Sequence, residues 1–192
     1  ANKGEAFKLI IKEFKDSGYY VTHKLLNSSD FGIPQKRERV FIVGFKFKKD
    51  FKKFTFPKET CVLPEEKIPL SRVLEESKSI DESYYFSQRA VDGLRKTKNF
   101  ILMNKGRTQD ISQPCNTVGA HLAKYSLNST DPVLMFGERY RMFTPREVAR
   151  IQSFPERFKL SKTKTWNYLA LGNAVPPVVM WHLTKSLKKT LE

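Results

Sequence analysis

The sequence has few cysteines and no long apolar run, and each absence excludes a class of protein. Two cysteines in 192 residues, Cys61 and Cys115, are too few for a disulfide framework or a four-ligand zinc site. No stretch of about 18 apolar residues occurs, so no membrane span is predicted. Residues 1–4 have no apolar segment behind a basic one and do not resemble a signal peptide. We therefore expect a cytoplasmic protein with no metal and no membrane partner.

Acidic residues are scarce relative to basic ones. The chain has 35 Lys or Arg residues and 20 Asp or Glu residues, a formal net charge of +15. Such an excess favours a polyanionic partner, because neutralising phosphates releases condensed counterions. Nucleic acid is the favoured partner, and the alternative is a soluble protein that is merely basic. Basic residues interleaved with phenylalanines over 36–58 indicate either a phosphate-facing surface or basic strand faces around a core.

The N-terminal region has the pattern of one end of an α/β sheet. Residues 4–17 predict an amphipathic helix, followed by a strand over 19–26. Residues 40–45 form a nearly unbroken apolar run, typical of a strand buried on both faces of such a sheet. A polar loop, 27–38, lies between the strands at the edge of the sheet. No glycine-rich first βα turn completes the unit, which indicates one end of a larger fold.

The C-terminal region opens with a strong helix start. Thr144 caps the free N–H groups, Pro145 suits the first helical position, and Glu147 completes a capping box. Val148 and Ile151 give this short helix its buried stripe. The other expectations are short helical segments over 64–98, an irregular or strand-and-turn region over 110–136, and a final helix over 177–191.

Three segments, in this order, resemble conserved segments of the DNA cytosine-5 methyltransferases. Residues 27–44 contain Gln35-Lys36-Arg37-Glu38-Arg39 and resemble the family's Gln-x-Arg-x-Arg segment. Residues 143–155 resemble its ninth conserved motif, and residues 171–177 resemble its tenth.

The resemblance implies an α/β fold. It would be the C-terminal portion of an S-adenosylmethionine-dependent methyltransferase fold, with a small mixed α+β target recognition domain. It divides the chain into the end of the catalytic sheet (1–46), the target recognition domain with the ninth motif (47–165), and the tenth motif with a returning helix (166–192).

The family acts on carbon 5 of a cytosine, which must be flipped out of the duplex to be reached. A fixed cation is needed beside the ring oxygen, and arginine supplies one with directional donors. By resemblance, Arg39 contacts the flipped cytosine, Arg37 pins the backbone or its neighbours, and Gln35 holds the loop. Thr117 and Arg107 are the candidates for contact with double-stranded DNA in the recognition region.

The tenth motif resembles the segment that lines the S-adenosylmethionine site. By resemblance, Asn173, Ala174 and Val175 contact this cofactor; Asn173 offers hydrogen-bond donors and an acceptor, and Val175 an apolar wall. The ninth motif is expected to organise the recognition lobe without touching DNA.

The family's nucleophilic cysteine lies in a Pro-Cys segment before the Gln-x-Arg-x-Arg segment, and this chain has none there. Pro114-Cys115 comes after that segment, and Cys61 lacks a matching context, so we expect both cysteines to be inert. The Glu-Asn-Val and Phe-x-Gly-x-Gly segments are also absent. We therefore expect an engineered boundary or an enzyme encoded as two polypeptides, which needs the N-terminal half of the methyltransferase as its partner.

Two other functions compete with an incomplete methyltransferase. One is a stand-alone sequence-specific DNA-binding protein derived from the recognition domain, which has no need of a flipped-base arginine or a cofactor wall. The other is an RNA-binding module, but no RNP-type motif, KH loop or RGG tract supports it. The compact spacing of the outer motifs favours a bacterial restriction-modification enzyme.

Overall fold

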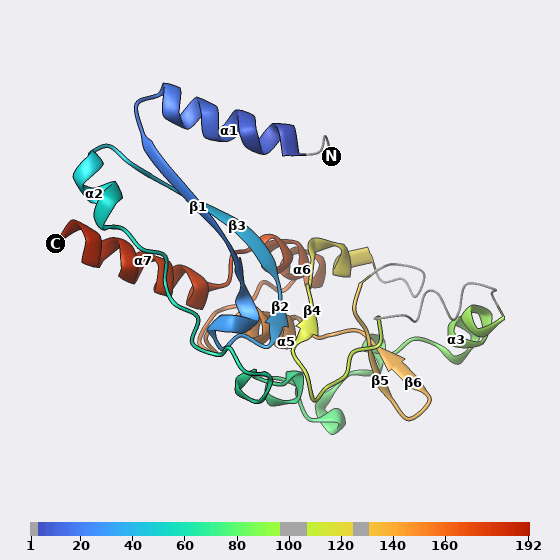
Figure 1. The fold of residues 1–192 in the computed structure, drawn as a ribbon. Coiled ribbons are helices and arrows are strands. Elements are labelled where there is room, and N and C mark those ends of the chain that lie inside the picture. The colour runs from blue at the N-terminus through green and yellow to red at the C-terminus, as the bar shows by residue number, and fades with distance from the viewer. Residues whose placement is uncertain (1–3, 97–106, 125–130) are drawn as a thin grey trace.

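A twisted ladder of two long antiparallel strands organises the N-terminal part of the chain (Figure 1). β1 (Tyr20–Asn27) pairs with β3 (Glu38–Phe45) over its full length, from Tyr20↔Phe45 at one end to Asn27↔Glu38 at the other. The computed structural model describes residues 4–96, 107–124 and 131–192. The predicted first helix is confirmed as α1 (Glu5–Asp16), and the predicted strands over 19–26 and 40–45 are confirmed as β1 and β3.

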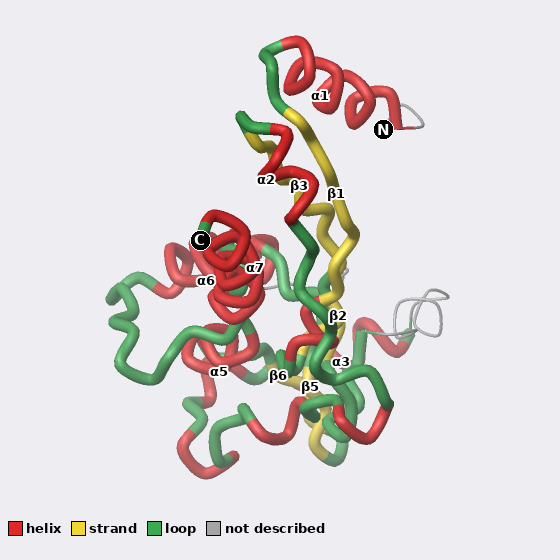
Figure 2. The backbone as a smooth tube through the Cα atoms, turned by 60° about the vertical axis from the view of Figure 1, so that its left-hand side comes forward, coloured by secondary structure: helices red, strands yellow, loops and turns green. Residues whose placement is uncertain are grey.

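The prediction that the second strand is buried on both faces is wrong for this chain. Val43 and Phe45 are buried in a cluster with Phe54 and Leu183, whereas Val40 is 48% exposed. One face of the ladder is covered by α7 (Pro177–Leu191), by α2 (Lys48–Lys53) and by the segment that follows α2. On the other face α1 lies over the first half of β1, residues 20–23, where Phe7 packs on His23, and the rest of that face stays open (Figure 2).

A second region, rich in short elements, follows the ladder. It contains 3-10 turns at Pro64–Glu66, Leu70–Arg72, Ser77–Ser79 and Glu82–Tyr84, then α3 (Gln88–Arg95), β4 (Cys115–Asn116), a 3-10 helix at Ala120–Lys124, β5 (Leu134–Phe136) and β6 (Arg139–Arg141). This agrees with the short helical and strand-and-turn segments predicted over 64–98 and 110–136, of which residues 97–98 and 125–130 lie outside the described residues. β5 and β6 form a two-stranded antiparallel sheet.

The C-terminal region supplies three helices, α5 (Pro145–Ile151), α6 (Lys164–Asn173) and α7. The capping box is confirmed: Thr144 accepts a hydrogen bond from the Glu147 N–H, and Glu147 accepts one from the Thr144 N–H. Glu147 is fully buried and also forms a bidentate ion pair with the buried Arg141, with both N–O distances at 2.8 Å.

The largest core joins residues that are distant in sequence. Leu70, Val118 and Leu134 of the middle region pack with Phe143, Val148 and Ile151 of the ninth-motif segment and with Tyr168 and Leu171 of α6. The middle region and the C-terminal helices therefore share one hydrophobic core. No helix in the described ranges is both long and apolar enough to span a bilayer.

Candidate active site

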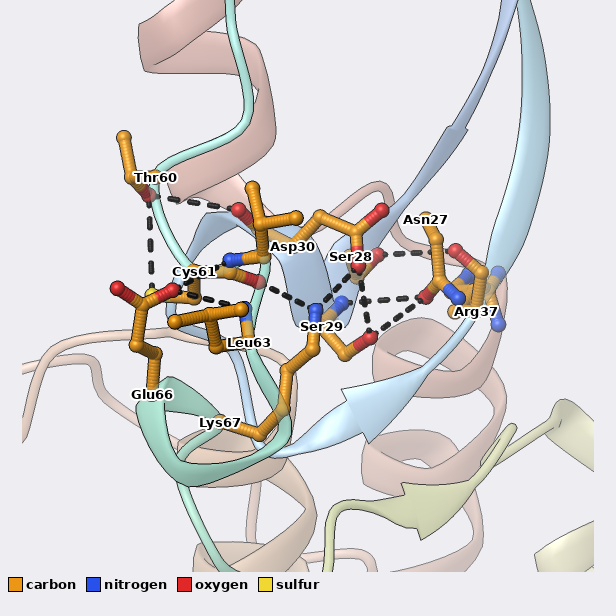
Figure 3. Close-up of polar contacts among 11 residues, drawn as sticks. Asn27, Ser28, Ser29, Asp30, Arg37, Thr60, Cys61, Leu63, Glu66 and Lys67 are labelled. Atoms are coloured by element: carbon orange, nitrogen blue, oxygen red, sulfur yellow. Dashed lines mark hydrogen bonds and ion pairs between the residues drawn. The ribbon is translucent and has the colours of Figure 1, made fainter.

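The loop between β1 and β3 is held in place by hydrogen bonds to its own residues and to the segment around residues 60–67 (Figure 3). Asn27 Oδ1 accepts the Ser29 N–H at 3.2 Å and so caps the 3-10 helix Ser28–Phe31. The Asp30 carbonyl accepts the Thr60 N–H at 2.8 Å, and its carboxylate lies 2.6 Å from Lys67 Nζ. The loop is thus tied to the segment that leads into the recognition region.

Arg37 is held at both its backbone and its side chain. Its carbonyl accepts the Ser28 N–H at 2.9 Å. Its guanidinium donates to the carbonyls of Val118 at 3.1 Å, Gly172 at 3.2 Å and Ala174 at 3.3 Å. One side chain therefore joins the Gln-x-Arg-x-Arg segment, the segment around Val118 and the tenth-motif segment.

The environment of the Arg37 guanidinium is buried and lacks an acidic partner. The side chain is 6% exposed, and Nε has no hydrogen-bond partner within the ranges the structure describes. Burial, followed by the positive charge of Arg39, lowers the pKa of Arg37. Because a guanidinium nevertheless stays charged near neutral pH, the three carbonyl dipoles are what compensate its desolvation.

Gln35 forms a second buried link, through β2 (Gln35–Lys36), which pairs in parallel with β4. Gln35 is fully buried; its Oε1 accepts the Val118 N–H at 2.8 Å and its Nε2 donates to Gln152 Oε1 at 2.9 Å. Gln152 Nε2 in turn donates to the Leu171 carbonyl at 2.6 Å. The side-chain amides of Gln35 and Gln152 thus link the loop to the ninth-motif segment and that segment to α6.

Gln152 is the member of this network to which the sequence assigned no role. Gln152 stands just after α5 and is fully buried. Its amide oxygen accepts a hydrogen bond from Gln35, and its amide nitrogen donates one to the Leu171 carbonyl. A single glutamine followed by Ser153 gives no periodic signal. Its place within the ninth-motif resemblance was the only available signal.

A close backbone approach fixes the position of the tenth-motif segment. A Cβ added at Gly172 would lie 2.3 Å from the Ala120 nitrogen and 2.3 Å from the Gly119 carbonyl carbon. Distances below 3.0 Å are not tolerated against backbone atoms, so only glycine fits here. α6 therefore lies directly against the 3-10 helix that follows Val118.

Arg39 and the proposed cofactor residues are more accessible than Arg37. Arg39 is exposed, and its Nη1 donates to the adjacent Glu38 carbonyl at 2.7 Å. Asn173 ends α6 and is exposed, Ala174 is half-buried, and Val175 is 45% exposed. The backbone of Ala174 is fixed by Arg37, whereas the side chains of Asn173 and Val175 point to open space.

The two candidates from the recognition region have different surroundings. Thr117 Oγ1 donates to the Lys36 carbonyl at 2.8 Å, which places it beside the Gln-x-Arg-x-Arg segment. Arg107 is only 7% exposed, and its Nε donates to the Asp131 carbonyl at 2.9 Å. Burial lowers the pKa of Arg107, and the charge of Asp131 opposes this shift. Thr117 thus joins the other predicted site residues, whereas Arg107 supports the fold of the recognition region.

Neither cysteine is close to the geometry of an activated nucleophile. Cys115 is 1% exposed, and burial raises the pKa of its thiol to about 12. Cys61 is half-buried beside Gly32. A thiolate is the reactive form, so Cys115 is an unreactive thiol near neutral pH. No group of three or more potential metal ligands occurs in the part of the chain that the structure describes.

Solved structures of methyltransferases share this fold. The Entamoeba histolytica methyltransferase EhMeth superposes with a TM-score of 0.71 at 20% identity, over 98% of this chain and 59% of that one. The S. pombe Dnmt2 methyltransferase superposes with a TM-score of 0.72 at 21% identity, over 98% of this chain and 62% of that one. The fold is therefore the mixed α/β fold of S-adenosylmethionine-dependent methyltransferases.

Sequence comparisons narrow the class. The family model described as C-5 cytosine-specific DNA methylase matches residues 1–189. The Type II methyltransferase M.FnuDI of Fusobacterium nucleatum is 32% identical over 219 residues, covering 97% of this chain and 60% of the relative. M1.ScrFI of Lactococcus lactis subsp. cremoris is 32% identical over 201 residues, covering 100% of this chain and 49% of the relative.

The chain belongs to the C-5 cytosine-specific DNA methylase family. It spans about half to three fifths of the length of these curated relatives.

Proposed function

We propose that this chain is the C-terminal part of a DNA (cytosine-5-)-methyltransferase of a bacterial restriction-modification system. It supplies sequence recognition and part of the active site to an enzyme that flips a target cytosine and methylates carbon 5 with S-adenosylmethionine. Residues 1–46 end the catalytic sheet, residues 47–165 form the target recognition domain, and residues 166–192 return to the catalytic domain.

The observation that carries the proposal is the position of Arg37. Its guanidinium binds the carbonyls of Val118, Gly172 and Ala174, so two segments that resemble family motifs and the segment around Val118 meet at one buried cation. A protein that only reads DNA needs no rigid link between its recognition region and the α6–α7 junction. An enzyme needs one, because the reacting atoms of the flipped base and of the methyl donor must be held about 3–3.5 Å apart and in line.

Arg39 is the residue that touches the target base in this proposal. Arg39 stands two residues after the fixed Arg37, and its guanidinium is exposed to solvent with one hydrogen bond, to the adjacent Glu38 carbonyl. A cation held beside the ring oxygen stabilises the negative charge that develops there when a nucleophile adds to the ring. Arg37 and Gln35 act as positioning residues for this group.

The α6–α7 junction has the properties of a cofactor wall. The side chains of Asn173 and Val175 are exposed at a place where Arg37 fixes the backbone. A carboxamide that donates and accepts, next to an apolar side chain, suits the polar and apolar parts of S-adenosylmethionine. The cofactor supplies the methyl group; these residues of the chain orient it and shield one side from water.

The nucleophile comes from the N-terminal half of the enzyme in this proposal. The attack on carbon 6 requires a thiolate, and the thiol of Cys115 is buried and protonated near neutral pH. Cys61 lies on the far side of the loop from Arg37, among the contacts of Asp30 and Lys67 (Figure 3). The chain alone should therefore bind DNA and transfer no methyl group.

The open face of the strand ladder is the expected contact surface for that half. Leu25 and Val40 are cross-strand partners on this face and are 54% and 48% exposed. Leu9, Ile10 and Phe14 of α1 are also 42–58% exposed. Several exposed apolar side chains on one part of the chain favour an interaction site.

The proposal is tested by adding a polypeptide that supplies the N-terminal half. Size-exclusion chromatography should show a one-to-one complex, and Leu25→Lys combined with Val40→Lys should prevent it. Met135→Lys is the matched control, because Met135 is a 44% exposed apolar residue of the recognition region. In the complex, Arg39→Ala should abolish methyl transfer without weakening assembly. A complex that forms equally well with the double variant would contradict the assigned contact surface.

A further inference from the structure

A lysine-rich hollow lies away from the candidate active site, between the C-terminal half of α7 and the segment after α2. Its volume is about 540 Å³. The residues that line it are Pro57, Lys58, His182, Lys185, Ser186, Lys188, Lys189 and Glu192. None of the residues assigned to the base or to the cofactor is among them.

The charge of this region is strongly one-sided. Four lysines face one carboxylate, Glu192, whose ion pair with Lys188 is long, at 3.6 Å, and solvent-exposed. Exposed pairs of this kind contribute little and leave the charge of the hollow positive. His182 also lines the hollow, and burial, followed by the charge of Lys185, lowers its pKa, which favours the neutral imidazole.

α2 extends the same positive surface. Figures 1 and 2 both show α2 beside the C-terminal end of α7, and Phe54 after α2 shares a core cluster with Leu183 of α7. All four lysines of α2 are exposed, namely Lys48, Lys49, Lys52 and Lys53. The two helices are therefore fixed relative to each other, and both carry exposed lysines.

The α2 part of this surface is at the opposite end of the strand ladder from Arg37 and Arg39. Those arginines stand at the Asn27↔Glu38 end, whereas α2 follows the Tyr20↔Phe45 end. Strands of eight residues put about 25 Å between the two ends. A base in the active site cannot touch the lysines of α2, which need an explanation of their own.

We propose that the lysines of α2, Lys58 and the C-terminal half of α7 form a second, sequence-independent binding site for the phosphate backbone of duplex DNA. Lysines are flexible point charges that suit phosphates and do not read base edges. DNA is the polyanion on which this family acts. An open hollow with exposed cations suits a long backbone better than an enclosed small molecule. The site would hold DNA that flanks the target or belongs to a second segment.

The test uses the chain itself and a duplex of about 20 A·T pairs. Such a duplex contains no cytosine, so its binding is independent of the proposed methyl transfer. Fluorescence anisotropy across a range of salt concentrations gives the number of phosphates neutralised, because log K falls by about 0.9 per contact per decade of salt. The variant combines Lys185→Gln, Lys188→Gln and Lys189→Gln. We expect the slope to become shallower by about 2 to 3.

The matched control removes three charges from another exposed helix. Lys8→Gln, Lys12→Gln and Lys15→Gln on α1 should change the slope by less than about 1. A second variant, with Lys52→Gln, Lys53→Gln and Lys58→Gln, tests the α2 side of the surface, and should act like the α7 variant. Circular dichroism melts check that all three variants are folded.

Three results would overturn the proposal. The first is an unchanged slope in both variants of the lysine surface. The second is an equal change in the α1 control, which would mean that only the net charge matters. The third is lysine-dependent binding to vesicles of anionic phospholipid with no effect on the duplex, which would assign the surface to a membrane.

Discussion

Replacing Gly172 by alanine should destabilise the protein, although alanine is the better helix former. The gain in helix propensity is about 1 kcal/mol. The added Cβ would stand 2.3 Å from two backbone atoms of Gly119 and Ala120. Backbone atoms cannot rotate away, so α6 must shift, and overpacking of this kind costs about 1–3 kcal/mol or more. The clash therefore outweighs propensity, with an expected net loss of about 2 kcal/mol.

Gly93→Ala is the matched control for this substitution. Gly93 also lies within a helix, α3, but a Cβ there meets nothing within 4 Å. Only the propensity gain remains, so this variant should be more stable than the wild type by about 0.5–1 kcal/mol. The same chemical change thus has opposite signs at the two positions.

Urea unfolding followed by circular dichroism measures both free energies, and thermal melts give a second reading. For a chain of this size, 1 kcal/mol corresponds to about 2–4 °C in Tm. Gly172→Ala should melt about 4–8 °C lower and Gly93→Ala about 1–4 °C higher. If Gly172→Ala were as stable as Gly93→Ala, the close contact between α6 and the segment after Val118 would not exist.

Three further substitutions test the buried groups. Arg37→Lys should lower the free energy of unfolding by about 2 kcal/mol, since an ammonium cannot reach three carbonyls, whereas Arg39→Lys should stay within about 0.5 kcal/mol in the same urea titration. Glu147→Gln leaves a buried arginine uncompensated and should cost about 3–5 kcal/mol, but Glu82→Gln, in an exposed pair, less than about 0.5 kcal/mol; equal costs would refute the burial of the first pair. Because the pKa of Cys115 is raised to about 12 in the folded state from 9.0, its contribution to stability is complete below about pH 9 and decreases as pH rises toward 12. Above pH 9 the free energy of unfolding of Cys115→Ala should therefore fall less steeply than that of the wild type, and the two slopes should differ by about 1.4 kcal/mol per pH unit. Parallel curves for the two proteins would show that the thiol is not buried.

Elements whose signals lie within a few residues were predictable. The capping box is encoded locally by the Thr144 hydroxyl, by Pro145 and by the Glu147 carboxylate. The bounds of α7 are encoded locally by one apolar stripe. α6 was missed because its buried residues are Asn167, Tyr168, Leu171 and Gly172, a mixture with no apolar period. Burial of the second strand was overestimated, since an apolar run does not show which of its faces finds a cover.

The site was predictable as a set of segments and not as a geometry. A spacing of two would put Arg37 and Arg39 on the same face of a regular strand. The strand breaks at Arg37, between β2 and β3, and the first arginine turns inward while the second stays at the surface. The bond between Gln35 and Gln152 joins residues 117 positions apart. No local pattern announces a contact of that kind.

The most direct test of the central claim is transfer of labelled methyl groups from S-adenosylmethionine to DNA. The chain is assayed alone and together with a polypeptide that supplies the N-terminal half of the methyltransferase. We predict no incorporation with the chain alone, incorporation at carbon 5 of cytosine with the pair, and loss of that signal on Arg39→Ala. Sequence-specific DNA binding without incorporation in either case would contradict the account and identify a stand-alone DNA-binding protein.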